Sequence, residues 1–170
     1  MNAELIVLRV VHILGALLWA GTSISMALFL GPAMASLGPA AGPVMGALVK
    51  RRQFTIIPIV AVITMLAGVR LLQLASMGFS AAYFATRSGQ TYIVGAVCAL
   101  AAFTVFMAVG HPAIGQTMKL AQQMAQAPES ERGAIATQMA ASRARGGKGS
   151  AAAALFLTIA AVAMAVGRYM

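Results

Sequence analysis

Four long apolar segments dominate the chain, and polar residues or runs rich in glycine and proline separate them. The apolar segments span about 5–34, 54–77, 90–111 and 151–168. An α-helix needs roughly 18–20 such residues to cross the hydrocarbon core of a bilayer. The pattern therefore predicts an all-α integral membrane protein, with residues 1–170 forming one domain, a four-helix antiparallel (up-down) bundle.

The composition supports lipid as the solvent for much of this surface. The chain of 170 residues is 61% hydrophobic and 9% charged, whereas a soluble domain carries roughly 25% charged residues. Twelve basic and three acidic residues give a net charge of +9, which in a soluble protein would suggest nucleic acid. Here the cations lie between apolar segments. The sequence therefore favours contact with anionic lipid head groups and no nucleic-acid partner.

The cations also predict an orientation. Connections 35–53 and 112–150 hold eight of the twelve, namely Lys50, Arg51, Arg52, Lys119, Arg132, Arg143, Arg145 and Lys148. The other four, Arg9, Arg70, Arg87 and Arg168, lie near the opposite ends of the apolar segments. Because loops rich in Lys and Arg stay in the cytoplasm, we expect both connections there and both termini on the outer side.

The long connection 112–150 is expected to have helical structure. Residues 113–126 alternate apolar and polar positions with a helical period, so the third helix should run into the cytoplasm beyond a kink at Pro112. Pro128 should end it. A second short helix is expected over about 130–143, followed by a basic, glycine-rich linker up to residue 150.

Several polar residues fall within the apolar segments, where ionisable groups are costly and suggest function. A rise of about 1.5 Å per residue puts His12, Arg70 and Cys98 roughly 10–12 Å below the outer surface. Arg9, Gln73 and Met164 lie close to the same level. His12 and Trp19 are seven residues apart, so they share one face of the first helix.

These residues each have a functional and a structural interpretation. His12 could be a ligand for haem or metal, or a proton carrier; alternatively it is a buried side chain that forms a hydrogen bond with a neighbouring helix. Arg9 and Arg70 could bind an anion or a haem propionate, or extend towards the interface. No acidic residue lies within the spans, so we expect an external anion or backbone carbonyls to be the partner of Arg70.

The second histidine, His111, lies near the cytoplasmic end of the third helix. Its separation from His12 along the membrane normal should be roughly 20 Å, so the two cannot hold one haem within a monomer. Two copies of His12 in a homodimer could. The structural alternative is that His111 caps carbonyl groups freed by Pro112.

A copper site is a further possibility, because soft sulfur ligands bind Cu(I). His12, Cys98 and Met164 would supply its ligands, although methionine is also an ordinary apolar filler. Cys98 is the single cysteine, which excludes an intramolecular disulfide. The chain has no Walker loop, H-E-x-x-H, C-x-x-C or G-x-S-x-G motif, so hydrolase or ATPase activity is disfavoured.

Three short motifs resemble the copper-resistance D (CopD-like) superfamily of small bacterial membrane proteins. They are R-V-V-H-I-L-G-A-L-L-W-A-G at 9–21, L-V-K-R-R-Q-F at 48–54 with A-G-V-R-L-L at 67–72, and M-A-V-G-R-Y at 164–169. The resemblance implies a multi-pass, four-helix unit of the bacterial cytoplasmic membrane with His12 as the leading functional residue. It also implies haem or copper as the candidate cofactor.

The haem-binding protoporphyrinogen oxidase branch of that superfamily pairs the histidine with a lysine early in its third helix. Residues 90–111 contain no lysine, and Gly95 or Ala96 stands roughly where it would fall. That enzyme activity is therefore disfavoured. The sequence leaves three hypotheses: a haem b- or copper-handling protein centred on His12, a non-catalytic subunit of a larger respiratory or photosynthetic complex or a homo-oligomer, and an anion carrier that uses Arg9 and Arg70.

Overall fold

The computed structural model describes residues 3–170, and its described residues are helical, with no strand. Four long rods follow one another: Ala3–Leu37, Gln53–Ala75, Arg87–Gln126 and Glu129–Tyr169. They have 35, 23, 40 and 41 residues and a mean hydropathy of 1.9 to 2.4 in their most apolar stretches. All four are therefore long and apolar enough to cross a membrane, as the hydrophobic pattern predicts.

The rods contain the following elements. The first consists of α1 (Ala3–Ser25), a π-helical turn (Met26–Leu30) and α2 (Gly31–Leu37); a 3-10 turn (Gly38–Ala41) and α3 (Gly42–Lys50) lead to α4 (Gln53–Ala75). After α5 (Ala81–Phe84), the third rod consists of α6 (Arg87–Val105), a second π-helical turn (Phe106–Gly110) and α7 (His111–Gln126). The last rod is α8 (Glu129–Val166) with a 3-10 turn (Gly167–Tyr169).

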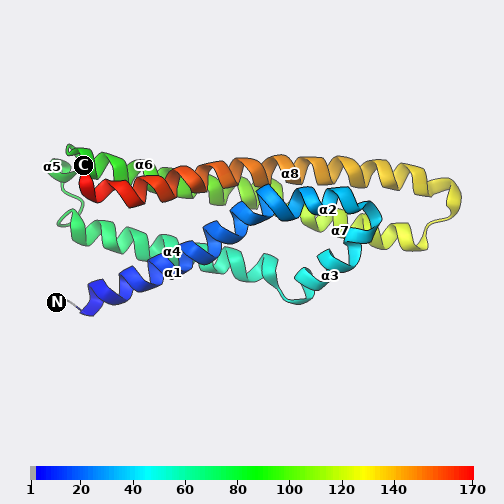
Figure 1. Ribbon diagram of the computed structural model, residues 1–170, viewed down its shortest axis with the longest axis horizontal. Coiled ribbons are helices and arrows are strands. Elements are labelled where there is room, and N and C mark those ends of the chain that lie inside the picture. The colour runs from blue at the N-terminus through cyan, green and yellow to red at the C-terminus, as the bar shows by residue number, and fades with distance from the viewer. Residues whose placement is uncertain (1–2) are drawn as a thin grey trace.

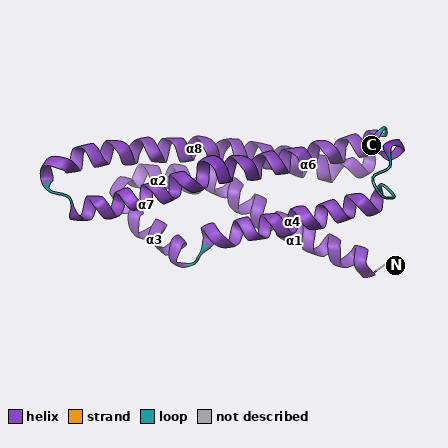
Figure 2. Ribbon diagram, turned by 180° about the vertical axis from the view of Figure 1, so that it is seen from behind, coloured by secondary structure: helices purple, strands orange, loops and turns teal. Residues whose placement is uncertain are grey.

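The rods run back and forth along one long axis (Figure 1). Both termini and α5 lie at one end, which we call the terminal end, and the turn from α7 to α8 lies at the other, the hairpin end. Helices α1 and α4 form one closely packed pair, and α6 and α8 form another. The two pairs diverge towards the terminal end, as the view from behind shows (Figure 2).

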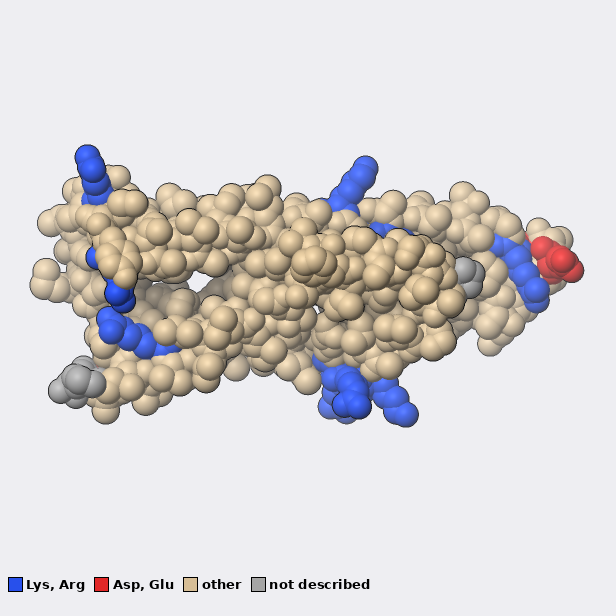
Figure 3. Space-filling view, viewed as in Figure 1, with Lys and Arg blue, Asp and Glu red and all other residues tan. Residues whose placement is uncertain are grey.

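Charge and exposure follow this long axis. Arginine and lysine side chains gather at the terminal end and from the middle towards the hairpin end, with an uncharged stretch between them on the face shown (Figure 3). In α8 the uncharged stretch extends from Lys148 to Arg168, or roughly 30 Å, close to the hydrocarbon thickness of a bilayer. Large apolar side chains such as Leu17, Leu66 and Leu155 are 61–66% exposed there, as expected for a surface solvated by lipid.

Small residues let the two pairs meet in the middle. Trp19 of α1 is buried against Ala61, Ala102, Ala153 and Leu157, which come from α4, α6 and α8. Its indole packs edge-to-face on Phe103 with ring centroids 6.4 Å apart. Alanine at these positions allows the close approach of helix backbones that membrane proteins use in place of a large apolar core.

Both π-helical turns lie just before a proline. The amide of Gly31 donates to Met26 O, and that of His111 donates to Phe106 O. Pro32 and Pro112 follow, and a proline ring would clash with the carbonyl four residues earlier in a regular α-helix. The wider turn relieves this clash: a local bulge lies at the predicted kink at Pro112, and the helix continues beyond it as α7, as predicted.

The prediction of a separate helix at 130–143 with a glycine-rich linker is wrong, because α8 is one helix of 38 residues. Glycine in a helix interior costs about 1 kcal/mol, but packing against α7 compensates here. A Cβ on Gly146 would lie 3.1 Å from Ala113 Cβ, and one on Gly149 would lie 3.0 Å from Val109 Cγ1. The glycines are therefore the contact surface for α7. Likewise, connection 35–53 is largely helical.

Candidate functional site

His12 contacts α4 at a place where glycine residues make room on both helices. Its Nδ1 lies 2.8 Å from the backbone oxygen of Thr64. A Cβ on Gly68 would lie 2.8 Å from His12 Cε1, so only glycine leaves space for the ring. In return, a Cβ on Gly15 would collide with Thr64 Oγ1. The imidazole and the threonine thus interlock across the α1–α4 interface.

This hydrogen bond determines the tautomer of the ring. A carbonyl oxygen only accepts, so Nδ1 carries the proton and Nε2 of the neutral ring keeps its lone pair. No described residue forms a hydrogen bond with Nε2, and no described side-chain nitrogen or oxygen is both buried and unpaired. Nε2 is therefore accessible. A ring held at one nitrogen with the other free is the usual arrangement of a metal-ligating histidine.

The level of His12 follows from Trp19. The two are seven residues apart in α1, so they share one face of the helix, and His12 lies two turns nearer the terminal end. Trp19 packs at the meeting point of the pairs, against Ala61 of α4 and Phe103 of α6. The His12 ring instead contacts Thr64 and Gly68 of α4. In the half of the molecule towards the terminal end, the surface is hollowed between the two pairs (Figure 3).

Arg70 has a partner within the protein, and the prediction of an external anion or backbone carbonyls is wrong. Its Nη2 and Nε lie 2.6 Å and 2.8 Å from Glu4 Oε1, and Nη1 donates to Gln73 Oε1 at 2.9 Å. Glu4 precedes the predicted span, but the long arginine side chain extends towards the helix end to reach it. Because Glu4 is eight residues before His12 in α1, this ion pair lies nearer the terminal end than the imidazole.

The predicted sulfur ligands belong to the other helix pair. Met164 of α8 packs on α6, where a Cβ on Gly95 would lie 2.9 Å from its Cε. Cys98, a half-buried free thiol, follows Gly95 by three residues in α6. His12 instead contacts α4. Among the described residues, no group of three His, Cys, Asp or Glu could hold a metal ion. Arg9 is exposed on α1.

His111 lies at a different level from His12. It lines a small pocket of about 140 Å³ with Arg52 and Thr55, at the start of α4. His12 contacts Thr64 instead. Nine residues of α4 separate Thr55 from Thr64, which is roughly 14 Å along the helix. The two histidines therefore do not share a site within one chain.

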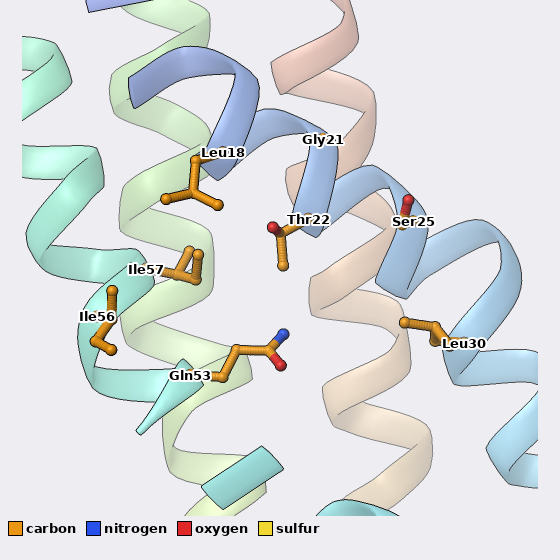
Figure 4. A pocket seen from close by; sticks show the side chains of 8 residues that line it. All are labelled: Leu18, Gly21, Thr22, Ser25, Leu30, Gln53, Ile56 and Ile57. Atoms are coloured by element: carbon orange, nitrogen blue, oxygen red, sulfur yellow. The ribbon is translucent and has the colours of Figure 1, made fainter. Parts of the chain in front are cut away.

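A pocket of about 550 Å³ lies between α1 and the first turns of α4 (Figure 4). Gln53 and Thr22 point into it from opposite sides, and the remaining lining residues are Leu18, Gly21, Ser25, Leu30, Ile56 and Ile57. None of these is a usual ligand for a transition metal. The sequence gives little signal for this pocket, since Thr22 is a neutral residue in the middle of the first apolar segment and Gln53 is a neutral residue just before the second.

No protein-family model, curated protein or solved structure matches this chain. The CopD-like resemblance therefore stays a hypothesis based on short motifs. The function has to be inferred from the chemistry of the residues that the fold brings together.

Proposed function

We propose that the protein is a multi-pass protein of the bacterial cytoplasmic membrane, with four antiparallel spans and both termini on the outer side. The distribution of cations supports this orientation, because Arg52, which follows Lys50 and Arg51, lines a pocket with residues of α7. In this orientation α7 and the first half of α8 form a hairpin extending into the cytoplasm.

We further propose that the protein binds haem b through Nε2 of His12 at the outer half of the bundle. The observation that carries this proposal is the hydrogen bond between Nδ1 and Thr64 O, which leaves Nε2 accessible and without a partner among the described residues. Gly68 and Gly15 hold the two partners in register. Bound haem b would supply one-electron chemistry; His12 would hold its iron through Nε2, and Thr64 would fix the orientation of the imidazole ring.

Copper is the less supported cofactor, because Cys98 and Met164 lie on the α6–α8 pair while His12 is bonded to α4. Oxidation of protoporphyrinogen is disfavoured as well. Gly95, one of the two positions where the lysine of that family branch would stand, is buried under Met164. We therefore propose a haem-binding protein with no enzyme activity of that kind.

A second haem ligand would come from a second copy of the chain. His111, the first residue of α7, lies beside Thr55 at the start of α4, whereas His12 contacts Thr64, so one protomer offers a single histidine at this level. Most of the apolar surface of the first rod is not covered within one chain, since 6% of the residues in its most apolar stretch are buried, against 33% in the last rod. This uncovered surface supports self-association. The same apolar surface also supports the second candidate function, a non-catalytic subunit packed against a larger respiratory or photosynthetic membrane complex.

The proposal is tested by expressing the full chain with adequate haem supply and purifying it in mild detergent. We expect a Soret band in the wild type, its loss in His12→Ala and its retention in His111→Ala. A colourless wild type, or a band that survives His12→Ala, would overturn the haem proposal. Co-purification of stoichiometric partner proteins with a colourless chain would favour the accessory subunit.

A further inference from the structure

Three consecutive cations, Lys50, Arg51 and Arg52, connect α3 to α4 without any acidic partner among the described residues. All three are exposed. The described ion pair joins Arg70 to Glu4 at the terminal end, and Glu129 and Glu131 lie in the first turn of α8 at the hairpin end. The positive charge at the start of α4 is therefore not neutralised by an acidic side chain among the described residues and attracts anions from outside the chain.

One of these cations faces a pocket that has further anion-binding groups. Arg52, Thr55 and His111 line the pocket of about 140 Å³, together with Val49, Phe54, Ile114, Gly115 and Met118. Arg52 and Thr55 belong to the start of α4, and His111 begins α7. The fold thus brings a guanidinium, a hydroxyl and an imidazole together from segments more than fifty residues apart in the sequence.

The hydroxyl of Thr55 is available for a ligand. Seven of the nine threonines donate their hydroxyl proton to a backbone carbonyl three or four residues earlier. Thr55 and Thr22 form no such bond, and each of them lines a pocket. Thr55 lies in the first turn of α4, beside the exposed cations, so its hydroxyl is open to a polar ligand from outside the chain.

The backbone at Arg52 favours the same ligand. Arg52 has a left-handed conformation with φ of 57°, and its carbonyl accepts from the amides of Thr55 and Ile56. No side chain caps the start of α4. The positive end of this helix of 23 residues is therefore open towards the cations that precede it.

We propose that Arg52, Thr55 and His111 bind a phosphate group, either in the head group of an anionic phospholipid or in a soluble phosphate compound. Arginine binds phosphate oxygens through two parallel hydrogen bonds, and the hydroxyl and imidazole add further donors. The apolar walls formed by Phe54, Ile114 and Met118 suit the first carbons of an acyl chain. This site is separate from His12 and does not depend on the haem proposal.

The test uses the purified full chain in a neutral detergent and three probes: phosphatidylglycerol, phosphatidylcholine and inorganic phosphate. Native mass spectrometry and calorimetry measure their binding to the wild type and to Arg52→Gln, Arg52→Lys and Thr55→Val. We expect Arg52→Gln to weaken binding at least about tenfold, because a charge-assisted hydrogen-bond pair is lost. Arg52→Lys should recover only part of that loss, since an ammonium cannot form the paired bonds.

Two matched controls separate a site from general electrostatics. Arg143→Gln removes one exposed cation of α8, and Gln53→Leu changes the next residue of α4, which lines the other pocket. Both should stay within twofold of the wild type. Circular dichroism and gel filtration check that each variant is folded.

Binding of phosphatidylglycerol without inorganic phosphate would identify a lipid head group as the ligand, and binding of both would identify a general phosphate site. Equal losses in Arg52→Gln and Arg143→Gln would overturn the proposal, as would wild-type protein that binds none of the three probes.

Discussion

Helices α1 and α4 meet, like α7 and α8, at close-packed glycines and through a polar side chain that bonds a backbone carbonyl of the neighbouring helix, yet the two interfaces differ in the polar group that remains unpaired. Between α7 and α8, Ser142 is 0% exposed and donates to Ala113 O at 3.1 Å, with Thr117 Oγ1 at 3.2 Å. Between α1 and α4, His12 donates through Nδ1 to Thr64 O and leaves Nε2 accessible. The fully buried serine donates its only proton within the protein, whereas Nε2 of the imidazole has no hydrogen-bond partner among the described residues.

This comparison gives a physical criterion for reading polar groups in membrane helices. A buried side chain whose donors and acceptors all find partners within the protein stabilises the helix pair. One that keeps an accessible lone pair, while its other end is fixed, is prepared for a ligand. Changes to α7–α8 should therefore affect stability alone, and changes to α1–α4 should affect stability and cofactor content together.

The largest effect is expected where the two pairs meet, at Trp19. Trp19→Ala removes the indole from its contacts with Phe103 and Leu157 and should lower the free energy of unfolding by about 3 kcal/mol. Leu17→Ala, on a side chain that is 66% exposed, should change it by less than about 0.5 kcal/mol. Unfolding in mixed detergent, followed by circular dichroism, measures both. Similar losses in the two variants would show that the pairs do not meet at Trp19.

The next largest effect distinguishes the α1–α4 interface from the α7–α8 interface. Gly68→Val puts a side chain against the His12 ring, and Gly149→Val puts one against Val109. Each should destabilise the fold by about 1–3 kcal/mol through overpacking. Only Gly68→Val should also lower haem content, measured by the ratio of Soret to protein absorbance. Equal haem loss in both variants would contradict the separation of the two interfaces.

A smaller effect is expected from Ser142→Ala. The variant loses one hydrogen bond to Ala113 O, which still lies 2.8 Å from Thr117 Oγ1, so the cost should be about 1 kcal/mol. Haem content should stay at the wild-type level. A loss of 3 kcal/mol or more would mean that Ser142 supports more than this one contact; hydrogen exchange across α7 would locate the effect.

The smallest effect is expected from Glu4→Gln. Both side chains of the Glu4–Arg70 ion pair are about two-fifths exposed, and exposed pairs contribute at most about 1 kcal/mol. The variant should unfold within that margin of the wild type, and the difference should shrink in high salt. Loss of haem in Glu4→Gln with normal stability would instead indicate that the pair organises the cofactor site.

Much of the helical architecture follows from the sequence, because runs of apolar residues in the first, second and fourth segments leave lipid as the only adequate solvent. The continuous α8 does not, since a run such as R-A-R-G-G-K-G-S contains strong helix breakers. Only the contact with Ala113 and Val109 explains why Gly146 and Gly149 stay helical. Propensity is local, and this compensation comes from tertiary packing.

The candidate site could also be predicted only in part, because the sequence gives the local helical spacing but not the packing of one helix against another. His12 and its shared face with Trp19 follow from helical spacing. The hydrogen bond to Thr64 and the room made by Gly68 depend on the register of α1 against α4, which the sequence does not specify. The estimated depth in the membrane also placed His12 at one level with Cys98 and Met164. However, His12 belongs to the α1–α4 pair, and the other two belong to the α6–α8 pair.

Haem titration of the purified apoprotein tests the role of His12 most directly. Wild type and Gly149→Val should both take up haem with a saturating Soret shift, whereas His12→Ala and Gly68→Val should not. Saturating, stoichiometric binding by His12→Ala that matches the wild type in affinity and spectrum would contradict the assignment of His12 as the ligand.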